Sequence, residues 1–196
     1  MISERRRVVA NIALSIDGCY QGPAGPHDMG WVMPHAVSDI ARNHLTSLWQ
    51  PATTVLLGRV NAEGFLSYWP QVADDENADP RDRAYGAWMR DSEKVVLSST
   101  LTEIPWKNAR ILDTPAADAV HLLRAERGGD IVIFASASVI KDLLKSDQVD
   151  RLALTVFPEI IGGRPFFDSP LPPSGWSLST ADASDGVVAQ VYDRLS

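Results

Sequence analysis

Short apolar runs alternate with amphipathic segments along most of the chain. The runs VVANIAL (8–14), TTVLLG (53–58) and DIVIFA (130–135) are almost continuously apolar, which is typical of strands buried on both faces. Segment 35–49 instead has apolar residues at helical spacing and is followed by Pro51, so we expect a helix that ends there. This alternation predicts a parallel sheet whose strands are connected by helices.

Weaker signals indicate the remaining elements of this part of the chain. Gly and Pro are frequent in the loop 22–34, and the polar segment 73–84 predicts a surface excursion, in which Asp79-Pro80 favours a turn or a helix start. The other expected elements are strands at 94–99 and 109–112, and helices at 59–65 (with Asn61 near its cap), 118–129 and 139–145.

The pattern changes after residue 149. Segments 149–160 and 186–195 have the character of strands, and no helical segment separates them, so we expect them to pair antiparallel around the loop 162–175. The chain has no internal repeat and no long linker. Residues 1–196 are therefore expected to form a single α/β domain with three layers and a mostly parallel central sheet that ends in an antiparallel pair.

Composition excludes several classes of function. A net charge of −7 argues against nucleic-acid and anionic-membrane partners, and the one basic cluster, ERRR at 4–7, is interpreted as a solvated lead-in to the first strand. The single Cys19 excludes an internal disulfide, and the four histidines lack H-x-x-x-H spacing, so no metal site is expected. No membrane span or signal peptide is recognisable, and we expect a cytoplasmic protein.

Small or polar residues follow three of the expected strands. These positions are Gly58-Arg59, Ser98-Ser99 and the run from Ala135 to Ser138. Ligands of open parallel sheets bind beyond the carboxyl ends of the strands, and small residues before a helix allow a phosphate to reach its free N–H groups. A tight strand-to-helix joint explains the run of small residues equally well, and Arg59 could instead form a surface ion pair.

Four segments together resemble one family. They are ANIALSIDG (10–18), TVLLGRVNAEGFLSYWP (54–70), KVVLSSTL (94–101) and VDRLALTVFPEIIGGRPFF (149–167). With them the chain resembles the dihydrofolate reductase superfamily over residues 8–193, in particular the branch that shares its fold with the C-terminal reductase domain of the riboflavin-biosynthesis deaminase/reductase. The resemblance implies a dihydrofolate reductase-like fold and NADPH as the cofactor.

The resemblance also implies which residues bind NADPH. Those expected to flank the nicotinamide are Ala13, Asp17 and Gly18, and those expected near the 2′-phosphate are Arg59, Leu97, Ser98 and Ser99. The helix after Gly58 would offer its N-terminus to the pyrophosphate, with Asn61 where the family often has Thr.

The segment FASASV (134–139) falls where the family usually has two or three glycines. The cofactor-binding residues expected there are Phe134, Ala135, Ser136, Ala137 and Val139. Family members often have a cis peptide bond between the first two glycines. Here the Ala135–Ser136 bond is either cis, at about 3–4 kcal/mol, or trans with a slightly different cofactor position.

The acceptor side has fewer matches. Dihydrofolate reductases have a carboxylate at the start of the first helix, shortly after a Trp and a Pro; here the matching position is near Ala36, which is not acidic. Asp39, one turn later, and His35 are the catalytic candidates, although Asp39 also fits an exposed helix face and His35 a cap.

Substrate candidates come from aromatic and basic residues. Trp31 and Phe157, like Trp49 and Trp69, could stack on an acceptor, although such residues are more often part of a core, and Arg164 could bind a substrate phosphate.

These features lead to one functional hypothesis and two alternatives. We expect an NADPH-dependent reductase that transfers hydride to a small planar heterocycle of pterin or pyrimidinone type. The alternatives are reduction of 5-amino-6-(5-phosphoribosylamino)uracil in the riboflavin pathway and a nucleotide-binding module that has lost catalysis. The resemblance also implies a homodimer formed through the late strands.

Overall fold

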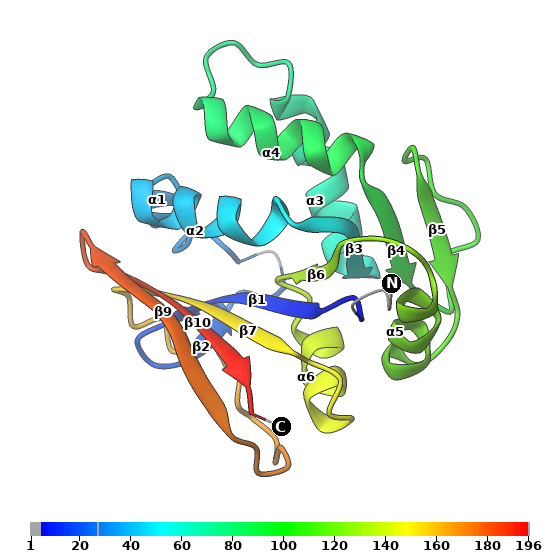
Figure 1. The fold of residues 1–196 in the computed structure, drawn as a ribbon. Coiled ribbons are helices and arrows are strands. Elements are labelled where there is room, and N and C mark those ends of the chain that lie inside the picture. The colour runs from blue at the N-terminus through cyan, green and yellow to red at the C-terminus, as the bar shows by residue number, and fades with distance from the viewer. Residues whose placement is uncertain (1–4, 27, 196) are drawn as a thin grey trace.

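An eight-stranded sheet forms the centre of the molecule (Figure 1). The computed structural model describes residues 5–26 and 28–195. The strands of the sheet are β1 (Val8–Ser15), β3 (Ala52–Gly58), β4 (Glu93–Leu97), β5 (Ala109–Leu112), β6 (Asp130–Phe134), β7 (Arg151–Phe157), β9 (Trp176–Ser184) and β10 (Val187–Arg194). Their order is β5-β4-β3-β6-β1-β7-β10-β9. Neighbours from β5 to β7 are parallel, whereas β10 is antiparallel to β7 and β9, which confirms the predicted fold class.

Helices cover both faces of the parallel part of the sheet. On one face lie α2 (Asp39–Trp49), α3 (Arg59–Val72) and α4 (Pro80–Asp91), and on the other α5 (Ala116–Ala125) and α6 (Ala137–Lys145) (Figure 1). In β1, Val8 and Ala10 pack with α5 and α6, whereas Val9 packs with α2 to α4. Apolar side chains are therefore needed on both faces of β1, which explains its nearly continuous apolar sequence.

Trp49 and Trp69 belong to the core. Both rings lie against Tyr85 of α4, with centroids 6.4 and 4.6 Å away, and Tyr85 also contacts Phe134 at 5.6 Å. The two tryptophans therefore pack α2 and α3 against α4, and the core interpretation is confirmed for them.

One predicted helix is divided in the structure, and one expected surface segment leads into a helix. The expected helix 35–49 is divided into α1 (Met33–Ala36) and α2, because Ser38 is the N-cap of α2 and its hydroxyl accepts a hydrogen bond from the N–H of Ala41. The expected surface excursion 73–84 leads into α4. Of the two alternatives for Asp79-Pro80, the helix start is the one observed, because Asp79 caps α4 and Pro80 occupies its first turn.

Arg6 corrects the interpretation of the basic N-terminal cluster. Its side chain is buried and donates hydrogen bonds to the carbonyl oxygens of Leu123 (3.0 Å) and Gly129 (2.8 Å) and to the hydroxyl of Thr54 (2.6 Å). Arg5 is exposed as expected, and Glu4 lies outside the described residues. Arg6 therefore connects the starts of β1 and β3 to the end of α5.

None of the helices described here is both long and apolar enough to cross a membrane.

Candidate functional site

The carboxyl ends of the parallel strands bring the predicted site residues to one edge of the sheet. Gly58 at the end of β3 pairs in register with Leu97 at the end of β4, and Ser15 at the end of β1 pairs with Phe157 at the end of β7. This is the edge at which ligands bind to open parallel sheets.

The N-termini of α3 and α6 meet at this edge. The N–H of Gly58, the N-cap of α3, donates a hydrogen bond to Ser136 Oγ over 3.1 Å, and Ser136 is the N-cap of α6. No side chain caps either helix, because Gly58 has none and the Ser136 hydroxyl bonds to Gly58 and to the carbonyl of Phe134. Two sets of first-turn N–H groups thus lie close together, and such groups bind phosphates.

Ala135 adopts a backbone conformation that favours glycine. Its φ is +51°, in the left-handed region, and its N–H donates to the carbonyl of Asn11 over 2.9 Å. All peptide bonds of the described residues are trans, so the Ala135–Ser136 bond is the trans alternative. A methyl group is the smallest side chain that carries a Cβ, and a small residue at this joint is what the close approach of a phosphate to the helix N-terminus requires.

The other residues expected near the adenosine part of the cofactor are held differently. Arg59 is the first residue of α3 and is exposed, whereas Asn61 lies inside the first turn and is not the cap. Ser98 Oγ accepts hydrogen bonds from the N–H groups of Thr100 (3.2 Å) and Leu101 (3.0 Å), and Ser99 is exposed. Ser98 therefore shapes the turn after β4, and Arg59 and Ser99 have the exposed polar groups.

Asp17 is hydrogen-bonded to the loop that follows β7. Its carboxylate accepts hydrogen bonds from Ser15 Oγ (2.5 Å) and from the N–H groups of Gly162 (2.9 Å) and Ile161 (3.3 Å). The hydrogen bond from Ser15, followed by that from Gly162, lowers the pKa of Asp17 to about 2. Asp17 therefore holds the loop after β7 against the turn at Gly18, beside the small sheet of β2 (Cys19–Gln21) and β8 (Arg164–Pro165).

An aromatic cluster brings residues that were expected to contact the acceptor together with Ala13, which was expected to flank the nicotinamide. The His35 ring stacks on Phe157 with centroids 5.5 Å apart and planes at 24°, and Trp31 meets Phe157 edge-on at 6.1 Å. Ala13 of β1 packs against the same cluster. The indole N–H of Trp31 is buried without a hydrogen-bond partner in the described part of the chain. Ala13, Trp31, His35 and Phe157 therefore form one cluster, in which Phe157 is buried.

Glu159 completes this cluster and was not identified from the sequence. Its Oε1 lies 2.9 Å from His35 Nε2, and its carbonyl accepts a hydrogen bond of 2.8 Å from the N–H of Ile16. The expected strand 149–160 included Glu159, whereas β7 ends at Phe157. Pro158 was the available signal, because it interrupts strand pairing.

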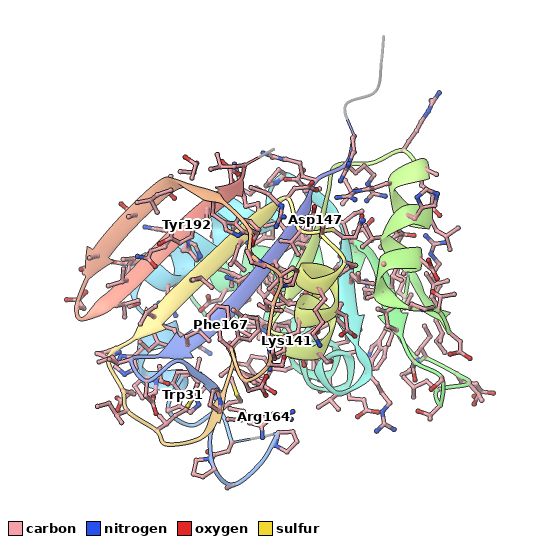
Figure 2. All side chains as sticks on the ribbon, turned by 90° about the horizontal axis from the view of Figure 1, so that it is seen from below. Trp31, Lys141, Asp147, Arg164, Phe167 and Tyr192 are labelled. Atoms are coloured by element: carbon pink, nitrogen blue, oxygen red, sulfur yellow. The ribbon has the colours of Figure 1, made fainter. Side chains whose placement is uncertain are left out.

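Asp39 and Arg164 form their ion pairs with residues outside this cluster. The Asp39 side chain is 83% exposed and pairs with Arg81 of α4 at 2.6 Å. Arg164 lies over the Tyr20 ring and 3.7 Å from Asp168, which in turn pairs with Lys141 at 2.6 Å. Figure 2 shows Arg164 and Trp31 at the end of the molecule towards which β1 runs.

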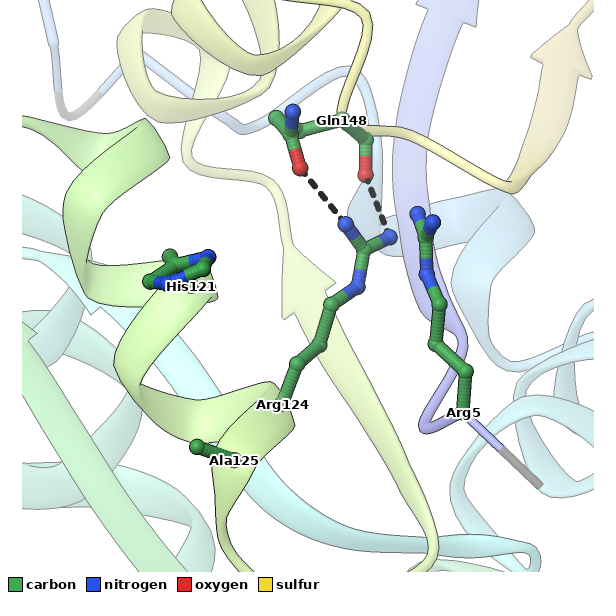
Figure 3. Close-up of a pocket in the computed structure, with 5 residues that line it drawn as sticks. All are labelled: Arg5, His121, Arg124, Ala125 and Gln148. Atoms are coloured by element: carbon green, nitrogen blue, oxygen red, sulfur yellow. Dashed lines mark hydrogen bonds between the residues drawn. The ribbon is translucent and has the colours of Figure 1, made fainter. Parts of the chain in front are cut away.

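A hollow of about 450 Å³ lies at the other end of the sheet, where the residues around it include Arg5, three positions before β1 (Figure 3). Its most buried basic group, Arg124, donates to both oxygens of Gln148 at 2.5 and 3.1 Å and pairs with Asp150 at 2.6 Å. The Arg124 guanidinium is thus engaged by groups of the protein itself, and its role is to stabilise the fold. In the described residues no cluster of three or more His, Cys, Asp or Glu side chains could bind a metal.

Solved structures of two classes share this fold. The dihydrofolate reductase of Enterococcus faecalis, solved with NADP(H), matches with a TM-score of 0.61 at 17% identity and 97% coverage of both chains. The diaminohydroxyphosphoribosylaminopyrimidine deaminase/5-amino-6-(5-phosphoribosylamino)uracil reductase of Thermotoga maritima matches with a TM-score of 0.67 at 16% identity, over 98% of this chain and 57% of its own. At such identities these matches establish the fold.

Sequence relatives extend over the same range. The uncharacterized protein YyaP of Bacillus subtilis (strain 168) is 28% identical over 193 residues, which cover 96% of this chain and 95% of YyaP. The family model for the RibD C-terminal domain matches residues 6–186. Because this match includes nearly all of the chain, the protein belongs to the RibD C-terminal domain family.

Proposed function

We propose that the protein is an NADPH-dependent reductase that transfers hydride to a small planar heterocycle of pterin or pyrimidinone type. The observation that carries the proposal is the meeting of two uncapped helix N-termini, at Gly58 and Ser136, at the ligand-binding edge of the sheet. Membership of a reductase domain family supports it. NADPH, when bound, supplies the hydride, and the protein positions the reactants.

The residues at this edge have distinct roles in the proposal. The first-turn N–H groups of α3, and those of α6 after Ala137, bind the pyrophosphate; the N–H of Ala137 itself donates to the carbonyl of Ala135 over 3.0 Å. Arg59 binds the 2′-phosphate together with Ser99. Arg59 would favour NADPH over NADH, because a guanidinium forms paired hydrogen bonds with a phosphate. The nicotinamide lies next to Ala13, and the acceptor stacks against Trp31 and Phe157.

A comparative titration tests the cofactor. Tryptophan fluorescence and its energy transfer to reduced nicotinamide would measure binding of NADPH and NADH to the wild type, Arg59→Ala and Arg127→Ala. We expect NADPH to bind at least tenfold more tightly than NADH, about 1.4 kcal/mol, and Arg59→Ala to abolish this preference. Arg127 is exposed between α5 and β6 and serves as the matched control. A wild type that binds neither nucleotide would refute the proposal.

A second candidate activity is reduction of 5-amino-6-(5-phosphoribosylamino)uracil, the reaction named for the Thermotoga maritima protein. The exposed Arg164 favours it, because its guanidinium is available to a substrate phosphate at the acceptor end of the molecule. NADPH oxidation would be measured with this compound and with dihydrofolate. Arg164→Ala would raise the KM for the phosphorylated acceptor alone, and NADPH binding without oxidation by either acceptor would identify a silent nucleotide-binding module.

We also infer that two copies of the chain pair through β9 and β10. No helix lies in front of β7, β10 and β9 when the molecule is seen from below (Figure 2). Eight residues of these strands on that face carry no charge; they are Leu154, Val156, Leu178, Ala181, Ala183, Val188, Gln190 and Tyr192. Arg194, at the end of β10 on the same face, lies over the Trp176 ring and pairs with Asp147. For a chain with a net charge of −7, an uncharged face is where a second copy can approach without repulsion.

A further inference from the structure

His35 and Glu159 form a hydrogen-bonded pair at the acceptor end of the site. His35 is contributed by α1 and Glu159 by the loop after β7, and their side chains are 2.9 Å apart. The His35 side chain is 19% exposed, so it is largely enclosed but still accessible to a bound molecule. An inference about this pair rests on the proposed reductase function.

Two contacts fix the orientation of the imidazole, and a backbone hydrogen bond holds one of its partners. Phe157 stacks against its face at 5.5 Å, which defines the plane of the ring. The Glu159 carboxylate engages Nε2, and because an ionised carboxylate only accepts hydrogen bonds, Nε2 carries a hydrogen. The backbone of Glu159 is itself held by the N–H of Ile16. Nδ1 is therefore the nitrogen that Glu159 does not engage.

The loop that carries Glu159 is also fixed. Asp17 accepts hydrogen bonds from the N–H groups of Ile161 and Gly162, two and three residues after Glu159. These hydrogen bonds give the Asp17 carboxylate a structural role that does not depend on contact with the nicotinamide. Glu159 is thus held by the ends of β1 and β7, although it lies in a loop, and its partner His35 is contributed by α1.

The position of the pair suits proton transfer during reduction. His35 and Phe157 belong to the cluster that includes Ala13 and Trp31, next to which the nicotinamide and the acceptor are expected. Asp39, the alternative acid, faces solvent and pairs with Arg81. Reduction of a C=N or C=O bond needs one hydride and one proton, and His35 is the titratable side chain of the cluster nearest to Phe157.

We propose that His35 is the proton donor of the reaction and that Glu159 is its positioning residue. The Nδ1–H bond of the imidazolium breaks and its electron pair stays on the ring, while the proton bonds to the acceptor nitrogen or oxygen. The adjacent acceptor carbon receives the hydride that NADPH supplies, which completes the two-electron reduction. The ring is left neutral with its hydrogen on Nε2, the form that Glu159 binds, and water reprotonates Nδ1.

The hydrogen-bonded pair can be tested without cofactor or acceptor. Nitrogen-15 NMR of the uniformly labelled protein reports which nitrogen of each neutral imidazole carries the hydrogen, and His35→Gln assigns the resonance. We expect the Nε2–H form in the wild type and in the control Glu76→Ala, and a mixture of both forms in Glu159→Ala. Glu76 is an exposed residue between α3 and α4. A neutral His35 with its hydrogen on Nδ1 in the wild type would overturn the proposal.

Kinetics test the role in catalysis. His35→Gln should lower kcat at least about 100-fold and leave NADPH affinity within twofold, because general acid catalysis contributes about 10²–10⁴-fold. The decrease of kcat with rising pH that marks the loss of the imidazolium should be absent from this variant. Glu159→Ala should lower kcat about tenfold, and Glu159→Gln, which keeps an acceptor oxygen, should restore part of the loss.

The outcomes separate the two proposals. A wild type that neither binds nor oxidises NADPH refutes the reductase function, and the proton donor with it. A wild type that turns over, with His35→Gln retaining its rate and its pH profile, refutes only the role of His35. Unchanged kinetics in Glu159→Ala would refute the positioning role of Glu159.

Discussion

Ala135 has the backbone of a glycine with the side chain of an alanine. Its φ of +51° is unfavourable for a residue with a Cβ by roughly 1 kcal/mol or more. Ala135→Gly should relieve this strain and raise the free energy of unfolding by about 0.5–1 kcal/mol, after the larger entropy of the unfolded glycine chain is included. Urea denaturation of the two proteins would measure the difference.

Ala84 provides the control for this substitution. It lies on the exposed side of α4 in ordinary helical backbone, so Ala84→Gly should destabilise the protein by about 1 kcal/mol. If both substitutions destabilise to the same extent, Ala135 is not strained in solution.

Sequence reasoning selected single residues that the fold brings together, and their roles in a site stay predictions. Trp31, His35 and Phe157 were identified as candidates and form one cluster with Ala13. Glu159 was missed because a carboxylate at the end of a strand is usually solvated, and its partner is 124 residues away in the chain. Only the three-dimensional arrangement shows such a contact.

Arg6 connects three elements at the amino-terminal edge of the sheet. Arg6→Met keeps the aliphatic part of the side chain but removes the donors to the carbonyl of Leu123 and the hydroxyl of Thr54. Leaving buried acceptors unpaired should lower the free energy of unfolding by about 2–4 kcal/mol. Arg5→Met is the control and should change stability by less than about 0.5 kcal/mol, because Arg5 is exposed. Equal effects in thermal or urea unfolding would contradict this assignment.

His44 makes the packing of α2 sensitive to acid. Its side chain is buried, and this burial lowers its pKa to about 4 from 6.5, although Asp182 of β9 acts in the opposite direction. Between about pH 4 and pH 6.5, His44 is protonated in the unfolded chain but neutral in the folded protein. The contribution of neutral His44 to the free energy of unfolding is therefore fully present above pH 6.5. As the pH falls towards 4, roughly 3 kcal/mol of this free energy is lost.

A substitution isolates this contribution. His44→Leu should lose about 3 kcal/mol less stability than the wild type between pH 7 and pH 4, because leucine takes up no proton. His121→Leu, on the exposed side of α5, should keep the wild-type pH dependence. The measurement is urea unfolding at both pH values, and parallel curves for the wild type and His44→Leu would exclude His44 as the cause.

Elements were predictable from the sequence in proportion to their burial. The strands β1, β3 and β6 are nearly continuous apolar runs because helices cover them on both sides. In contrast β9 was missed, since it is an exposed edge strand, and the alternation in its sequence, WSLSTADAS, shifts by one residue at an irregularity between Leu178 and Thr180. Asp79-Pro80 indicated the start of α4, but the length of this helix was not predicted, because α4 is largely polar and buries few side chains.

At the scale of the whole molecule, the two ends of the sheet have different roles. The amino ends of the strands are connected by fully paired arginines such as Arg6 and Arg124, which stabilise the fold. The carboxyl ends have helix N-termini without side-chain caps and the His35–Glu159 pair, which are the groups that we propose bind ligands. This division follows from the parallel sheet, because all crossover loops that precede a helix lie at one edge.

The uncharged face of β7, β10 and β9 gives the last prediction. Leu178 on β9 is 52% exposed, so Leu178→Asp should change the stability of one chain little but introduce two facing charges into a symmetric dimer. Sedimentation should find twice the 21.4 kDa chain mass for the wild type and the single-chain mass for this variant. Leu122→Asp is matched in exposure, at 49% on α5, and should remain dimeric. A monomeric wild type would refute the homodimer, and a dimeric Leu178→Asp would mean that another surface of the chain forms it.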